Sequence, residues 1–159
     1  MDNTGISNVK RGVSIAADNA SVVINSSEIV ARYYGVTVGA SGVELSVNGG
    51  TVQGWAAIMF TANDWTVDRI KSNKGAVVNA QGAELVGRSI SDEGYGIVVV
   101  QQDYNGAELT FTDCTMLTTV EDGKTGAWQG GIVVRSYGNK ISVSGGYIES
   151  SNITERNLM

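Results

Sequence analysis

The sequence predicts an all-β fold in which short strands and sharp bends repeat along the chain. A small residue followed by an apolar–any–apolar triplet occurs five times, and an apolar pair with an aliphatic residue at a constant distance downstream also occurs five times. The 159 residues include 21 glycines and no proline. Proline cannot donate a backbone hydrogen bond, so its absence suits a chain whose N–H groups take part in strand pairing. A repeat of this kind indicates the architecture before any single residue is interpreted.

Each repeat opens with a strand in which a small residue precedes the apolar positions. The five copies span residues 12–15, 35–38, 57–60, 96–99 and 131–134. Alternating apolar residues give a strand one buried face. Stacking the copies gives an inward aliphatic column of Val13, Val36, Ile58, Ile97 and Ile132. The positions expected to point outward are Ser14, Thr37, Met59, Val98 and Val133.

The remainder of each repeat has a stricter spacing. An apolar pair is followed five residues later by a third apolar residue, as in Val22/Ile24 with Ile29, Leu45/Val47 with Val52, Val78/Ala80 with Leu85, Leu109/Phe111 with Met116, and Ile141/Val143 with Ile148. Two small residues lie between them: Ser26-Ser27, Gly49-Gly50, Gly82-Ala83, Asp113-Cys114 and Gly145-Gly146. Small residues tolerate the backbone angles of a sharp bend. Each repeat therefore predicts three short strands, with a two-residue bend between the second and the third.

A coil of about 22 residues cannot bury its inner face alone, so equivalent strands must stack in parallel about 4.8 Å apart. We predict a single domain over residues 1–159, a parallel β-helix of about five coils that begin near residues 12, 35, 57, 96 and 131. Residues 1–11 and 151–159 are interpreted as partial coils. Such open ends are expected to adjoin further coils or to self-associate, because they leave strand edges unpaired. An antiparallel β-sandwich is the alternative architecture.

The motifs resemble those of the pectate-lyase-like superfamily of right-handed parallel β-helices, and especially its non-catalytic adhesin and passenger domains. The resemblance covers about residues 12–150 and rests on the Gly-Φ-x-Φ openings and the Φ-x-small-small-x-Φ bends, where Φ is apolar. A coil length near 22 residues also suits right-handed winding. The resemblance implies a bacterial or phage protein at the cell surface or outside the cell. In the enzymes of that superfamily, polysaccharide lies along the first strands.

Three insertions, at about residues 61–76, 86–95 and 117–129, all flank the first strand of a coil. Aromatic residues gather near the same strand, and a row of flat rings beside a groove could stack on sugars. The alternative is that these rings pack on one another and hold the loops in place. The candidate glycan-binding residues are Trp55, Trp65, Tyr95, Tyr104, Trp128 and Tyr137.

Composition argues against several other functions. The net charge is −5 and the basic residues are scattered, so neither nucleic acid nor an anionic membrane is an expected partner. No apolar run approaches the roughly 20 residues of a membrane span, so membrane insertion is not expected. The chain has no histidine and a single cysteine, so we expect no metal, no cofactor and no histidine-activated nucleophile.

These observations together predict a non-catalytic extracellular or surface β-helix scaffold that contacts a polysaccharide or other glycan along the Gly-Φ-x-Φ strands. No catalytic residue is assigned. The alternative is a degenerate or partial polysaccharide lyase or glycoside hydrolase, which would need loop carboxylates within about 5–10 Å of one another. The available loop acids are Asp64, Asp68, Asp92, Glu93, Glu121 and Asp122. Solvated loop charge is the expected role of these acids.

Overall fold

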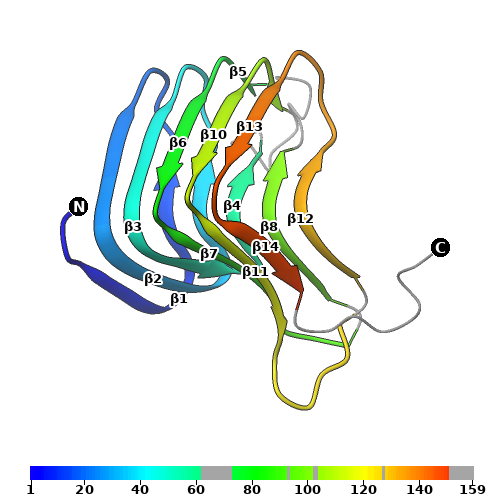
Figure 1. The fold of residues 1–159 in the computed structure, drawn as a ribbon. Helices are drawn as coiled ribbons and strands as arrows, with labels where there is room; N and C mark the ends of the chain where they lie inside the picture. Colours follow the sequence, from blue (N-terminus) through cyan, green and yellow to red (C-terminus); the bar gives the residue numbers. More distant parts are fainter. Residues whose placement is uncertain (62–72, 93, 102–103, 127, 151–159) are drawn as a thin grey trace.

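The computed structural model describes residues 1–61, 73–92, 94–101, 104–126 and 128–150. Within these ranges the chain is all-β and contains no helix, and its parallel strands form a curled sheet (Figure 1). The described residues therefore include no helix of the length and apolarity that crossing a membrane requires. The predictions for Trp65, Asp64, Asp68, Glu93 and the partial coil at 151–159 fall outside the described residues.

The described residues form β1 (Gly5–Ile15), β2 (Ser21–Val38), β3 (Glu44–Gly54), β4 (Ala56–Phe60), β5 (Asn73–Lys74), β6 (Val77–Gln81), β7 (Glu84–Ser89), β8 (Tyr95–Gln101), β9 (Tyr104–Asn105), β10 (Glu108–Thr112), β11 (Thr115–Val120), β12 (Trp128–Val134), β13 (Lys140–Ser144) and β14 (Tyr147–Ser150). Twelve of them belong to one sheet, and β5 and β9 form a separate pair. The long strands β1, β2 and β3 bend and contribute to more than one part of the sheet.

The pairing divides the large sheet into three rows of stacked strands. Row A contains the ends of β1 and β2, followed by β4, β8 and β12. Row B contains the starts of β2 and β3, followed by β6, β10 and β13. Row C contains the start of β1, the middle of β2, the end of β3, and β7, β11 and β14. Every pairing between the described strands is parallel, which excludes the antiparallel sandwich.

The register of rows B and C confirms the predicted columns. In row B the paired residues are Val22, Leu45, Val78, Leu109 and Ile141, and two positions later Ile24, Val47, Ala80, Phe111 and Val143. In row C they are Ile29, Val52, Leu85, Met116 and Ile148. The constant five-residue spacing between the two rows therefore reflects a bend of constant length.

The bend between rows B and C confirms the role predicted for its small residues. The first residue of each bend has a left-handed backbone, with φ of 46° at Ser26, 66° at Gly49, 59° at Gly82, 51° at Asp113 and 65° at Gly145. Glycine, serine and aspartate are compatible with this conformation, whereas β-branched residues are not. The left-handed first residue therefore recurs in all five bends, whereas a left-handed second residue occurs only at Gly50 and Gly146 among them.

Row A departs from the predicted register at its fourth strand. Ile58 pairs with Val99 and not with Ile97, and Val99 in turn pairs with Ile132. Ile97 instead lies level with Ala56, two residues away from its predicted position. A shift of two residues preserves the alternation of faces, and residues 97–100 are all apolar, so the sequence pattern could not distinguish the two registers.

The sides on which the apolar side chains of β8 lie also differ from the prediction. Val98, predicted to face outward, belongs to the main core between the rows, together with Val99. The predicted inward residue Ile97 lies instead in a second cluster with Ala56, Met59 and Val100. Tyr34, Trp55 and Val133 pack against this second cluster, which we call the outer cluster. The outward face of row A is thus apolar and buried at Met59, Ile97 and Val100, whereas the polar residues Ser14 and Thr37 lie at the equivalent position of the first two strands.

Candidate functional site

Three aromatic side chains from three layers form a continuous row beside row A. Tyr34 lies near the end of β2, Trp55 lies between β3 and β4, and Tyr95 opens β8. The ring centroids of Tyr34 and Trp55 are 5.8 Å apart, and those of Trp55 and Tyr95 are 5.9 Å apart, both edge to face. This arrangement is the favoured one for aromatic pairs. We call these three residues the aromatic row.

The aromatic row is partly buried and partly open to solvent. Tyr95 is 46% exposed, whereas Tyr34 and Trp55 are half-buried against the outer cluster. Burial raises the pKa of the Tyr34 hydroxyl, and the Arg11 guanidinium acts in the opposite direction. That guanidinium lies 5.5 Å from the centroid of the Tyr34 ring, a cation–π distance. The row therefore packs on the protein and still leaves ring surface open to solvent.

Of the other predicted glycan-binding residues, Tyr104 and Tyr137 do not join this row in the structure. Trp128 pairs through its backbone with Tyr95, but its side chain, like all of Trp65, lies outside the described atoms. Tyr137 is 80% exposed on the turn before β13. Tyr104 is fully buried, which removes its ring from contact with a ligand.

Tyr104 is buried because it joins several layers of the core. Its hydroxyl donates a hydrogen bond of 2.6 Å to the carbonyl oxygen of Ala40, and its ring packs edge to face on Phe60 with centroids 5.4 Å apart. The side-chain amide of the buried Gln101 donates to the Tyr104 carbonyl and to Asn139. Buried polar groups require such partners, so this network supports a structural role for Tyr104.

The buried hydroxyl of Tyr104 leads to a prediction about alkaline stability. Burial raises its pKa to about 12, above the value of about 10 expected in an unfolded chain. As the pH rises, the unfolded state therefore loses this proton first. The contribution of the protonated Tyr104 hydroxyl to the free energy of unfolding is fully present below about pH 10 and is lost as the pH rises to about 12. Between these limits, urea unfolding should show the wild type losing about 2 kcal/mol more than Tyr104→Phe. The same pH dependence in both proteins would contradict the assigned environment.

A groove lies beside the aromatic row, where rows C and A meet. Its volume is about 630 Å³, and its lining includes Lys10, Arg32, Gln53, Arg88 and Glu121. Four of these residues come from β1, β2, β3 and β7, and Glu121 directly follows β11, so the groove crosses the stacked strands. The backbone joins the two features, since Gln53 and Arg32 each precede an aromatic-row residue by two positions.

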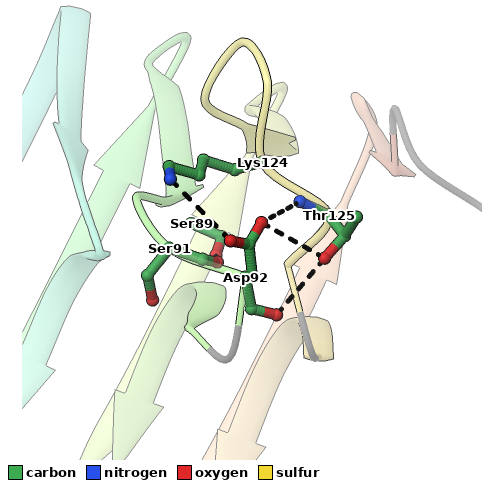
Figure 2. Close-up of polar contacts among 5 residues, drawn as sticks. All are labelled: Ser89, Ser91, Asp92, Lys124 and Thr125. Carbon is green, nitrogen blue, oxygen red and sulfur yellow. Dashed lines mark hydrogen bonds and ion pairs between the residues drawn. The ribbon is translucent and has the colours of Figure 1, made fainter.

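Two of the described loop acids, Asp92 and Glu121, contact residues of a neighbouring layer. The backbone N–H of Thr125 donates a 3.0 Å hydrogen bond to Asp92 Oδ1, and Lys124 Nζ lies 3.8 Å from Asp92 Oδ2 (Figure 2). Glu121 Oε1 lies 3.7 Å from Arg88. Among the described residues, no three Cys, Asp or Glu side chains gather as a metal site would require. The contacts support a structural role for Asp92 and Glu121.

Comparison with known proteins gave no match: no family model, no curated protein and no solved structure matches the chain. The class of protein is therefore defined by the structure itself. It is an all-β protein whose parallel strands stack in register in a curled sheet, with a partly exposed aromatic row and a groove on its outer surface.

Proposed function

We propose that the chain is a right-handed parallel β-helix of about five coils that serves as a non-catalytic scaffold at the cell surface or outside the cell. The three-strand repeat and its in-register pairing support the β-helix. Stacking of this kind produces a stiff rod, because each layer is hydrogen-bonded to its neighbours along most of its length. Such a rod would hold surface residues from successive layers at a regular spacing of about 4.8 Å.

We further propose that the scaffold contacts glycans through the aromatic row. The observation that carries this proposal is the alignment of Tyr34, Trp55 and Tyr95 across successive layers, with ring surface left open to solvent. Flat rings offer an apolar face to the C–H groups of a sugar, and tyrosine hydroxyls and tryptophan N–H groups are able to hydrogen-bond to sugar hydroxyls. The contacts of Asp92 and Glu121 favour no catalytic alternative, so the scaffold is the function proposed.

A polysaccharide pull-down or glycan array tests the aromatic row. The wild type should bind at least one glycan, and Tyr95→Ala should bind it about tenfold more weakly, a loss of about 1.4 kcal/mol. Trp55→Ala should have at least the same effect, with circular dichroism to check that it folds. Tyr147→Ala is the matched control, because this tyrosine is 55% exposed but lies in row C.

Two results would count against the proposal. Equal losses of glycan affinity in Tyr147→Ala and in Tyr95→Ala would show that the aromatic row does not bind the glycan. New reducing ends or unsaturated sugars in the bound polysaccharide would show catalysis and would favour the lyase or hydrolase alternative.

A further inference from the structure

The charge of the groove is opposite to that of the whole chain. The protein carries a net charge of −5, yet the groove lining holds the three cations Lys10, Arg32 and Arg88 and the single carboxylate of Glu121. A cleft lined by one sign of charge concentrates ligands of the opposite sign. The groove is thus a cationic surface on an acidic protein.

The cations of the groove differ in how far they are neutralised. Arg88 lies 3.7 Å from Glu121, with both side chains partly exposed. Within the described part of the chain, neither Lys10 nor Arg32 has an ion-pair partner, and the Arg32 guanidinium lies 6.0 Å from the centroid of the Tyr33 ring. The uncompensated positive charge therefore lies at the end of the groove formed by β1 and β2.

The order of the side chains along the groove suits an extended ligand. Lys10 is in the first layer, Arg32 in the second, Gln53 in the third and Arg88 in the fourth. Neighbouring layers are about 4.8 Å apart, so these polar groups follow one another along the stack. Val30 and Ile90 add apolar surface to the lining. A linear molecule with both apolar faces and negative groups fits this combination.

An acidic polysaccharide meets these requirements better than a polyphosphate. The planar guanidinium of Arg32 can bind a carboxylate or a sulfate through two parallel hydrogen bonds, and Gln53 can bond to hydroxyl groups. A nucleic acid would need many of its phosphates neutralised, whereas the groove lining offers three cations, one of them already paired with Glu121. Sugar rings also match the half-buried apolar part of the groove.

We propose that this groove binds an acidic polysaccharide lengthwise, with a carboxylate or sulfate group held between Lys10 and Arg32. The groove is a second contact surface, adjacent to the aromatic row. The inference rests on the proposed function only in taking the ligand to be a glycan. Arg88 is already paired with Glu121, so its side of the groove contributes less to anion binding.

Three polymers with one backbone test the inference: carboxymethyl-dextran, dextran sulfate and unmodified dextran. Titration calorimetry at low salt should show at least one charged polymer binding more tightly than unmodified dextran. The double variant Lys10→Gln/Arg32→Gln should bind it at least tenfold more weakly. Arg135→Gln/Lys140→Gln is the matched control, because it removes the same charge from exposed positions near β12 and β13. The affinity of this control variant for the charged polymer should fall by less than threefold.

The carboxylated and sulfated polymers distinguish the two sources of negative charge. The inference is overturned if the two double variants lose affinity equally, or if the wild type binds neither charged polymer. It is also overturned if a duplex DNA binds with equal affinity and the same loss in Lys10→Gln/Arg32→Gln. Loss of binding in Tyr95→Ala without loss in the groove variant would retain the proposed function and reject the groove. The reverse pattern would retain the groove and reject the aromatic row.

Discussion

Phe111→Ala is expected to lower the free energy of unfolding by about 3–5 kcal/mol. Phe111 is fully buried in row B, where its backbone pairs with Ala80 on one side and with Val143 on the other. The neighbouring strands are fixed by hydrogen bonds in register, so they cannot move together to fill the space left by the ring. The loss therefore includes both the transfer of the ring from water and the remaining cavity. Urea denaturation followed by circular dichroism measures this difference.

Val143→Ala is the matched control for this substitution. Val143 occupies the same column but is 48% exposed in the last described layer. Its truncation should cost less than about 1 kcal/mol, because little apolar area is withdrawn from water. Similar losses for the two variants would contradict the difference in burial between the interior and the last layer of the stack.

Gly87→Ala is expected to destabilise the protein by about 3 kcal/mol or to prevent folding, because the new methyl group would overlap a neighbouring backbone. A Cβ atom at this position would lie 2.4, 2.5 and 2.6 Å from the C, O and N atoms of Ile97. Relief would require β8 to move away from β7, and β8 is itself paired with both β4 and β12. Thermal unfolding monitored by circular dichroism provides the measurement.

Gly5→Ala shows whether loss of glycine is harmful in itself. A Cβ atom at Gly5 would have no neighbour within 4 Å, and its φ lies outside the left-handed region. We expect its stability to change by no more than about 0.5 kcal/mol. If Gly87→Ala were as stable as Gly5→Ala, the close crossing of β7 and β8 would be refuted.

The accuracy of the fold prediction differed between the rows for a physical reason. Rows B and C are joined by a bend of two residues, so the spacing of Leu109 and Met116 in the sequence determines their register. Row A follows long insertions of variable length, which separate its strands from that constraint. The run of apolar residues at 97–100 then satisfied two registers equally, and the pairing of Ile58 with Val99 could not be predicted.

The candidate site was only partly predictable for similar reasons. Trp55 and Tyr95 were selected because they precede the first strand, and the structure brings them together. Tyr104 lies shortly after a first strand, but its hydroxyl finds a partner at Ala40, distant in sequence, and its ring becomes part of the core. No local pattern in the sequence indicates such a partner.

The groove had no signal in the sequence. Lys10, Arg32 and Arg88 are far apart along the chain and belong to no motif, so they looked like scattered surface charges. Stacking brings them to one surface, because each lies near the same corner of a different layer. Sites of this kind become visible only after the register of the layers is known.

The central claim is that equivalent residues stack in register, and distances between spin labels test it most directly. Labels at Val23, Asn79, Thr110 and Ser142 would report on one column of row B, with the buried Cys114 first changed to alanine, the residue at the equivalent bend position 83. From Val23, the backbone separations should increase in equal steps of about 4.8 Å per layer and reach about 19 Å at Ser142. Separations that fail to increase from Asn79 to Thr110 to Ser142 would contradict the stacked parallel architecture.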